Sequence, residues 1–354
     1  QTKANKIVKR RGFIDIPKAD DAPKAGSNRS KECMLFLTEG DSAATMISRG
    51  KEKMDNNLVG IYPLKGVPLN YRNAKSNRKT SNVEINNILT LMGLKYGVDY
   101  AKQENLDALR YGRIIIATDA DVDGKHIKGL ILNIFGVFAP ILIEKGYICA
   151  LLTPIYRIEH NKKQTLLYSE VEYKNWISKT PNHKKWKITY FKGLGTHTKK
   201  DIASIFDNIR IIRYVWDDDA DLSLKLAFDK ELTKERKKWL EDNVDEEEYV
   251  YKEKETVTDF INNDFILYSH YHVKRAIPSL EDGLTVCRRK ILFACMKKNA
   301  TKKLKVTQLA GIVSELSAYH HGEQSLQDSI IKMTQNFPGS NNIPLLKGEG
   351  EFGS

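Results

Sequence analysis

Short apolar runs that each lead through a polar turn into a helical pattern recur in the first part of the chain. The run 33–38 (CMLFLT) leads into an acidic turn and then into residues with apolar side chains at helical spacing. The β-branched run 113–118 (RIIIAT) leads into a second acidic turn and a long apolar helix. Strands that alternate with helices in this way predict an α/β domain with a doubly wound, mostly parallel sheet.

The segments around these two units predict the rest of the first domain. Residues 1–32 are polar and basic and contain Pro and Gly, so we expect an extended segment or linker, with order beginning at Cys33. The stretch 62–82 is rich in Pro, Gly, Asn and basic residues and predicts a surface loop. Strand patterns follow at 147–157, 165–173 and 186–196. We expect the α/β domain to span 33–200.

Helical patterns dominate the rest of the chain. Residues 201–255 are strongly charged and predict a helical connector, which closes with the acidic run 241–248. Residues 256–354 predict several short helices, at about 283–297, 305–318 and 323–337. Short helices joined by tight connections are typical of a helix-turn-helix or winged-helix domain.

Charge is distributed unevenly along the sequence. The 57 Lys and Arg residues against 45 Asp and Glu give a net charge of +12. Residues 1–200 carry +16 (35 basic and 19 acidic residues) and residues 201–354 carry −4, within which the run 241–248 alone contributes −6. A basic half is typical of a protein that binds a polyanion, because Lys and Arg neutralise phosphates and release counterions. A solvated basic surface is the alternative that charge alone leaves open.

The composition argues against several other classes of protein. Hydrophobic residues make up 41% of the chain, which is too many for a wholly disordered protein. No run approaches the roughly 20 apolar residues of a membrane-spanning helix. The four cysteines form no CxxC pair, which argues against a disulfide framework and a zinc ribbon and favours a reducing intracellular compartment.

Three aspartates at alternate positions follow the buried run 113–118. On an extended segment Asp119, Asp121 and Asp123 would project to one side, where like charges repel unless a cation lies among them. Their hard oxygen atoms suit Mg²⁺, which typically binds one or two carboxylates together with phosphate oxygens. A Ca²⁺ EF-hand is rejected because its loop needs an acidic residue where this chain has Leu130. A solvated acidic turn is the remaining alternative.

A second acidic turn follows the other apolar strand. Glu39 and Asp41 lie at the carboxyl end of the run 33–38, where open α/β sheets bind their ligands. If the two strands are neighbours, Glu39 meets the aspartates at one edge of the sheet. An acidic turn of this kind is commonplace by itself, but four carboxylates at strand ends favour a metal-dependent phosphoryl-transfer site.

These motifs resemble those of a known enzyme family. TEGDSA at 38–43, PLKG at 63–66, ATDADVDG at 117–124 and FKGLGT at 191–196 resemble, in order and spacing, the Toprim region of type II DNA topoisomerases. Five later motifs resemble the start of the winged-helix DNA-gate domain of that family. They are KRAIPSLEDGL at 274–284, RRKILF at 288–293, AYHHGEQSL at 318–326, QNFPGSNN at 335–342 and GEGEFGS at 348–354. The resemblance covers 13–354 and points to the eukaryotic and large-DNA-virus branch. It implies a Rossmann-like Toprim domain at 33–200 and a truncated winged-helix domain at 256–354.

A magnesium site is implied by this resemblance. Glu39, Asp119 and Asp121 would be the Mg²⁺ ligands of the catalytic site. Asp123 would assist a second ion, which gives a two-metal site. ATP would be used only by a separate ATPase domain, because no Gly-rich phosphate loop or other nucleotide motif is visible in residues 1–354.

The same resemblance implies contacts with DNA. His320 and His321 would be catalytic residues near the scissile phosphate, to which a histidine can donate hydrogen bonds. A buried, hydrogen-bonded helix end is the alternative for these paired histidines. The residues implied to lie along the DNA are Lys65, Asn70, Phe191, Lys192, Arg288, Arg289, Tyr319 and Ser325.

The sequence departs from the family pattern at three places. Val67 and Thr285-Val286 stand where the family usually has Lys and Lys-Pro, which puts the DNA affinity of these two loops in doubt. The nucleophilic tyrosine of the family follows the GEFGS-like turn, whereas this sequence ends at Ser354. Tyr319 matches a different position, so no covalent nucleophile is assigned. We expect a central fragment that binds Mg²⁺ and DNA but forms no covalent link with DNA.

The resemblance implies that the parent protein is an ATP-dependent type II DNA topoisomerase, which passes one duplex through a transient double-strand break in another. Its partner would be double-stranded DNA, and a homodimer is expected because each protomer would cut one strand. No membrane partner is expected, and the location would be the nucleus, or the cytoplasm of an infected cell if the protein is viral. The alternatives are another Toprim enzyme, such as a primase or nuclease, and a non-catalytic DNA-binding module.

Overall fold

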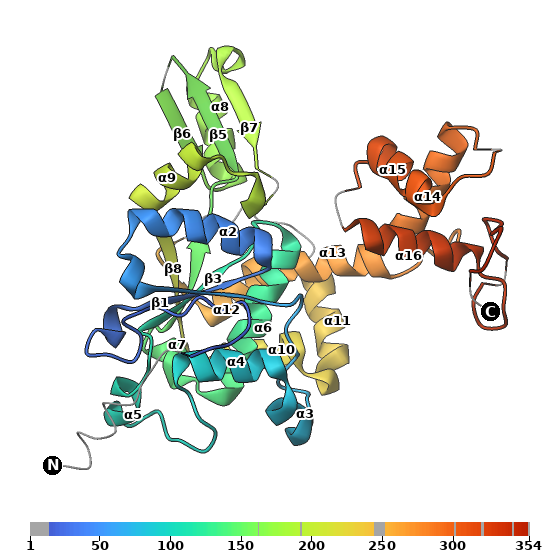
Figure 1. Cartoon of the computed structure of the whole chain (residues 1–354). Coiled ribbons are helices and arrows are strands. Elements are labelled where there is room, and N and C mark those ends of the chain that lie inside the picture. Colours follow the sequence, from blue (N-terminus) through green and yellow to red (C-terminus); the bar gives the residue numbers. More distant parts are fainter. Residues whose placement is uncertain are drawn as a thin grey trace. The chain divides into compact units, whose positions relative to one another are not determined.

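The computed structural model describes residues 14–161, 163–191, 193–243, 252–300, 302–319, 322–341 and 343–352. The chain divides into two compact units, Gln1–Tyr268 and Ser269–Ser354, and each is described here by itself (Figure 1). None of the helices in the described ranges is long and apolar enough to cross a membrane.

A six-stranded sheet forms the centre of the first unit. Its strands, in spatial order, are β2 (Val59–Pro63), β1 (Met34–Thr38), β3 (Arg113–Ala117), β4 (Ile148–Leu152), β8 (Arg210–Val215) and β9 (Lys254–Thr256). All neighbouring strands are parallel except β4 and β8, which are antiparallel. The first strand lies between the second and the third, so the sheet grows in both directions from β1. The predicted α/β fold with a mostly parallel sheet is confirmed.

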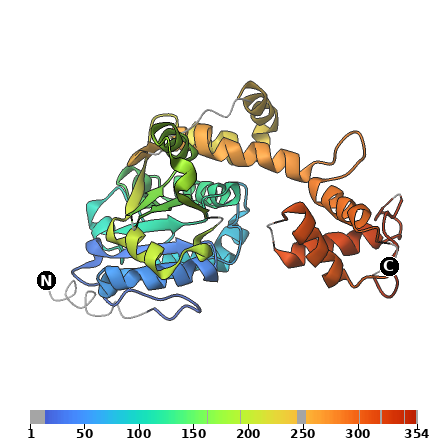
Figure 2. The ribbon, with the colours of Figure 1, turned by 90° about the horizontal axis from the view of Figure 1, so that it is seen from above.

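Helices cover both faces of this sheet, as the two views of the ribbon show (Figure 1, Figure 2). One face packs against α2 (Asp41–Gly50) and α9 (Lys199–Asp207). The other packs against α4 (Val83–Met92), α6 (Val122–Phe138), α7 (Ile141–Glu144) and α10 (Ala220–Phe228). Helix α6 is buried along most of its length, because its Ile, Leu and Phe residues occur on every side. The remaining helices of the unit are α3 (Ser76–Ser81), α5 (Gln103–Asp107), α8 (Glu170–Lys179), α11 (Thr233–Asp242) and α12 (Val257–Asp259).

A smaller antiparallel sheet lies at one end of the first unit (Figure 1). Its strands, in spatial order, are β6 (Lys163–Leu167), β5 (Tyr156–His160) and β7 (Lys187–Tyr190). The strand predicted at 165–173 ends at Leu167, because Ser169 caps helix α8 by accepting a hydrogen bond from the Glu172 backbone N–H at 3.1 Å.

The segment 201–255 contains helices, as predicted, but it also returns to the main sheet. The sequence of β8 is RIIRYV, in which Ile212 and Tyr214, two residues apart on one side of the strand, are buried in the sheet core. β9 then pairs with β8 in parallel register. The end of the α/β domain predicted near residue 200 therefore differs from the structure, in which the sheet continues to Thr256.

The segment that precedes β1 is packed against the sheet, and order does not begin at Cys33 as predicted. Ile16, Ala22 and Ala25 are buried in the main core, while Asp20 forms an antiparallel bridge with Ile61 of β2. The few apolar residues of this segment are too scattered to produce a periodic pattern, which is why the sequence predicted a linker.

Helices α14 (Val286–Lys297), α15 (Val306–Ser317) and α16 (Glu323–Thr334) form the core of the second unit, and α13 (Ile266–Ala276) leads into it. Their buried side chains are Ile291, Ala294, Leu309, Ala310, Val313, Leu326, Ile330 and Met333. The three core helices lie within a few residues of the predicted ones. No strand occurs among the residues of this unit that the structure describes, so its assignment as a winged-helix domain stays a prediction.

Candidate functional site

The two acidic turns lie side by side at the carboxyl edge of the main sheet. β1 and β3 are parallel neighbours, with Thr38 level with Ala117. The backbone N–H of Glu39 donates to the Ala117 carbonyl at 3.2 Å. The backbone N–H of Asp119 donates to Glu39 Oε2 at 3.3 Å. The structure therefore brings Glu39 and Asp119 together, which the sequence predicted on condition that the two strands are neighbours.

The side chain of Asp119 is fixed by the Gly-rich loop that follows β7. The Leu194 backbone N–H donates to Asp119 Oδ1 at 2.7 Å. Gly193 lies so close that a Cβ atom added there would overlap Asp119 Oδ2. The motif FKGLGT was recognisable in the sequence, but the contacts of its glycine and backbone amide with this carboxylate were not predicted. The signal was a glycine three residues after the end of β7, where close approach of another group requires the absence of a side chain.

Asp121 and Asp123 belong to the N-terminal end of helix α6. Asp121 caps the helix, since its Oδ1 accepts a hydrogen bond from the Gly124 backbone N–H at 2.8 Å. Asp123 lies in the first turn, where the helix dipole stabilises negative charge. The three aspartates were expected on an extended segment, but the helix begins between the second and the third of them.

Burial and mutual repulsion disturb the ionisation of the carboxyl groups. Burial raises the pKa of Glu39 to about 7, and the negative charge of Asp119 adds to this effect. Asp121 and Asp123 raise the pKa of Glu39 further. Burial also raises the pKa of Asp119, against the opposite effect of its hydrogen bond from Leu194. A nearby cation would relieve this repulsion, because it favours the charged form of each carboxylate.

The donor set suits a hard divalent cation, since carboxylate oxygens are ligands that Mg²⁺ prefers. Over the part of the chain that the structure describes, no lysine or arginine pairs with Glu39, Asp119 or Asp121. Among the same residues, no three His, Cys, Asp or Glu side chains are already close enough to hold a metal ion. Asp119 and Asp121 instead accept hydrogen bonds from the backbone, so the carboxylates would have to turn toward a shared ion.

The residues of PLKG and the loop after it lie in two different environments. Lys65 is exposed. Asn70 is half-buried: its Nδ2 donates to the Phe228 carbonyl at 2.8 Å, and its Oδ1 accepts from Asn133 Nδ2 at 3.0 Å. These hydrogen bonds hold the loop onto α6 and α10, so the amide that was expected to lie along DNA already has partners inside the protein.

Phe191 is also an interior residue. Its side chain is only 5% exposed, and its ring centroid lies 4.1 Å from that of His197. A DNA contact from this position would therefore come from its backbone. The neighbouring Lys192 lies outside the described residues.

Two arginines of the second unit differ in their partners. Arg289 is exposed and pairs with Asp282, the shortest distance being 2.7 Å from Nη2 to Oδ2. Arg288 is half-buried and lines a cavity of about 420 Å³ together with Asp282 and Met333. Arg288 is thus the less neutralised of the two cations.

Tyr319 is half-buried within the second unit. Burial raises the pKa of its hydroxyl, although a hydrogen bond with the side chain of Ser325 lowers it. Ser325 is exposed at the start of α16. His320 and His321, which the sequence placed near the scissile phosphate, lie outside the described residues.

Three known domain families match successive parts of the chain. Residues 34–154 match the Toprim domain, and residues 151–273 match the C-terminal associated domain of Toprim. Residues 275–354 match the A-subunit family of DNA gyrase/topoisomerase IV. Together these matches cover all but one of the residues from the start of β1 to residue 354.

Individual relatives are similar over nearly the whole chain. DNA topoisomerase 2-alpha of Mus musculus is 43% identical over 365 residues, which cover 98% of this chain and 24% of the relative. DNA topoisomerase 2-beta of Gallus gallus is 42% identical over 374 residues, which cover 100% of this chain and 23% of the relative. The solved DNA-binding, cleavage and re-ligation domain of Plasmodium falciparum topoisomerase II aligns with a TM-score of 0.80 at 40% identity, over 98% of this chain and 48% of that one. The chain spans about a quarter of the length of its curated relatives, and over that span it belongs to the type II DNA topoisomerase family.

Proposed function

We propose that this chain is part of the DNA cleavage and religation core of an ATP-dependent type II DNA topoisomerase, which passes one duplex through a transient double-strand break in another. The observation that supports this most strongly is the meeting of Glu39 and Asp119 at the carboxyl edge of the sheet, with Asp121 at the start of α6. The relatives named DNA topoisomerase 2 make DNA the expected substrate.

Glu39, Asp119 and Asp121 would hold Mg²⁺, and Asp123 would assist a second ion. When bound, Mg²⁺ supplies stabilisation of the negative charge on the phosphate oxygens and on the leaving 3′-oxygen. The protein contributes orientation, because the Leu194 N–H keeps the Asp119 carboxylate turned to one side. Burial of Glu39 keeps water away from part of this carboxylate and so strengthens its attraction for a cation.

The basic first half of the chain would hold the phosphate backbone of the DNA. Lys65 of the first unit and Arg288 of the second are the best placed of the expected contacts, since Lys65 is exposed and Arg288 lines a cavity. Each phosphate neutralised would release counterions, which makes the affinity dependent on salt. The assembly would be a homodimer in which each protomer cuts one strand. It would act in the nucleus, or in the cytoplasm of an infected cell if the protein is viral.

No tyrosine of this chain is assigned as the covalent nucleophile. Tyr319 is half-buried, and burial raises the pKa of its hydroxyl, which opposes formation of a phenolate. By itself the chain would therefore bind Mg²⁺ and DNA without forming a phosphotyrosyl link.

The proposal is tested by metal binding and DNA cleavage. Isothermal titration of this chain with Mg²⁺ should show binding that Asp119→Asn and Asp121→Asn each weaken at least tenfold. Asp41→Asn is the matched control, because Asp41 is 70% exposed and pairs with Lys18 at 2.7 Å.

Cleavage is measured with full-length protein that contains this chain. Asp119→Asn should abolish Mg²⁺-dependent cleavage while DNA binding persists, and near-normal cleavage would refute the metal assignment. Cleavage that leaves no protein–DNA bond after denaturation would instead favour a Toprim nuclease.

A further inference from the structure

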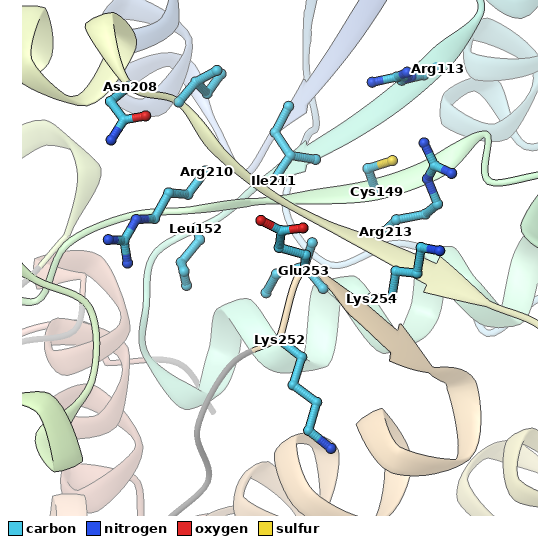
Figure 3. Close-up of a pocket in the computed structure, with 12 residues that line it drawn as sticks. Arg113, Cys149, Leu152, Asn208, Arg210, Ile211, Arg213, Lys252, Glu253 and Lys254 are labelled. Carbon is cyan, nitrogen blue, oxygen red and sulfur yellow. The ribbon is translucent and has the colours of Figure 1, made fainter.

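A basic groove with a volume of about 620 Å³ lies over the half of the main sheet formed by β3, β4, β8 and β9 (Figure 3). Its lining residues are Arg113, Cys149, Leu152, Asn208, Ile209, Arg210, Ile211, Ile212, Arg213, Lys252, Glu253 and Lys254. Five of these side chains are cations and one is an acid. The apolar members form the floor from β4 and β8, and the cations extend around it.

Among the residues that the structure describes, few acidic groups neutralise the cations of the basic groove. Arg113, Arg213, Lys252 and Lys254 are exposed and form no ion pair with any residue that the structure describes. Arg210 stacks over the Tyr168 ring at 4.2 Å and has a distant carboxylate partner, 3.8 Å away, on α8. A concave surface with this excess of positive charge concentrates anions, because the low-dielectric walls focus its field.

Arg113, Arg213 and Lys254 form a row across the sheet. Arg213 is level with Cys149 of β4 on one side and with Lys254 of β9 on the other. Arg113 opens β3, two strands away from β8, and precedes by two residues Ile115, which is level with Cys149, so the row bends at this end. With strands about 4.8 Å apart, the row is about 15 Å long. One strand of duplex DNA carries a phosphate every ~3.4 Å along its axis, so the row spans about four phosphates.

Two of these arginines are held toward the floor of the groove. The aliphatic part of Arg213 lies over Gly146, where an added Cβ atom would be 2.8 Å from Arg213 Cδ. Arg113 and Arg213 both lie near the Cys149 thiol, since each lowers its pKa against the larger effect of burial. Figure 3 shows Cys149 between these two side chains. Packing on Gly146 restricts the aliphatic part of Arg213, which lowers the entropy that this side chain loses when an anion binds.

We propose that the basic groove is a second DNA-binding site, which holds the phosphodiester backbone away from the metal centre. It is separate from that centre because Arg113 and Asp119 lie at opposite ends of β3, about 20 Å apart on an extended chain. Arginine suits phosphate since its planar fork can donate two parallel hydrogen bonds to it. The choice of DNA among polyanions rests on the proposed function.

Triple variants and a salt titration test this site. Arg113→Gln/Arg213→Gln/Lys254→Gln removes the row, and Lys95→Gln/Lys102→Gln/Lys145→Gln removes three exposed cations outside the groove. Binding of a fluorescent 30-base-pair duplex to this chain is followed by fluorescence anisotropy between about 50 and 200 mM salt, the range in which phosphate contacts dominate the response. Circular dichroism checks that each variant is folded. Lys252→Gln/Lys254→Gln serves as a milder variant if the first is unstable.

Each phosphate contact contributes about −0.9 to the slope of log K against log salt. The row variant should therefore have a slope that is less negative by about 2 to 3. Its affinity should fall at least tenfold below that of the control variant at the same salt. Equal slopes for the two triple variants would overturn the second site. Loss of binding to poly-glutamate without loss of binding to duplex would also overturn it, and would assign the groove to an acidic protein. Failure of the wild-type chain to bind duplex at all would instead contradict the proposed function.

Discussion

The Leu194 backbone N–H donates a 2.7 Å hydrogen bond to Asp119 Oδ1, so the loop after β7 fixes a carboxylate that lies 75 residues earlier in the sequence. Gly193 makes this approach possible, because any side chain there would occupy the space of the Asp119 carboxylate. Groups that orient a metal ligand in this way commonly matter nearly as much as the ligand. The motifs at 117–124 and 191–196 are therefore parts of one site.

Gly193→Ala should damage this site without removing a carboxylate. The added methyl group overlaps Asp119 Oδ2 and would push the side chain off the Leu194 N–H. Mg²⁺ affinity, measured by isothermal titration, should fall roughly 10- to 100-fold, as for other losses of ligand support. Gly195→Ala is the matched control, since its new Cβ would only meet Ser42 Cβ at an ordinary 3.6 Å. Equal affinities for the two variants would show that Asp119 does not need this loop.

Glu39→Gln should have opposite effects with and without metal. Burial and the neighbouring aspartates raise the pKa of Glu39 from its ordinary 4.5 to about 7, so the metal-free protein loses stability as the pH rises from about 4.5 to 7 and stays destabilised above that. At pH 8 without Mg²⁺, the variant should therefore gain about 3 kcal/mol in free energy of unfolding. Added Mg²⁺ should stabilise the wild type more than the variant in thermal unfolding. A variant that is less stable than the wild type in metal-free buffer would contradict this account.

The sequence predicted the parts of the site that follow from strands and their ends. The runs before Glu39 and Asp119 are short, apolar and followed by acidic turns, so their place at one sheet edge follows from parallel pairing. What could not be predicted depends on contacts between distant segments, such as the amide hydrogen bonds of Asn70 to Phe228 and Asn133. A polar residue in a loop gives no local sign of whether water, DNA or the protein satisfies it.

The fold was predictable to a similar extent. The central strands and the helices of the second unit have clear periodicity, whereas β8 follows a charged helix and β9 has only three residues. The packing of Ile16 and Asp21 depends on core residues about 40 to 90 positions later, which no local pattern reveals.

His197 should give the protein an acid-sensitive stability. Burial lowers its pKa from the ordinary value of 6.5 to about 4, and its Nδ1 has no hydrogen-bond partner among the described residues. The unfolded chain takes up this proton near pH 6.5 while the folded protein does not. The stability that depends on the neutral ring is thus complete above about pH 7 and is lost as the pH falls toward 4, by roughly 3 kcal/mol.

His197→Leu should flatten this part of the pH profile, which is measured by urea unfolding between pH 4 and 7.5. Phe191→Leu is the control, because it disturbs the same ring contact without removing a titrating group. It should lower stability at every pH and leave the slope unchanged. An unchanged slope in His197→Leu would mean that other groups cause the acid sensitivity.

Asp21→Asn should destabilise the first unit far more than a surface charge would. Asp21 pairs with the buried Arg110 and accepts a hydrogen bond from the Tyr111 hydroxyl at 2.6 Å. Loss of its charge leaves the buried guanidinium without this carboxylate to balance its charge, at a cost of about 3 to 5 kcal/mol in free energy of unfolding. Asp20→Asn removes a pair with Lys51 in which the Asp20 side chain is 55% exposed, and it should cost about 1 kcal/mol. Urea denaturation that gave similar losses for both variants would mean that the segment before β1 is only loosely attached, whereas the predicted difference would make it an integral part of the sheet core.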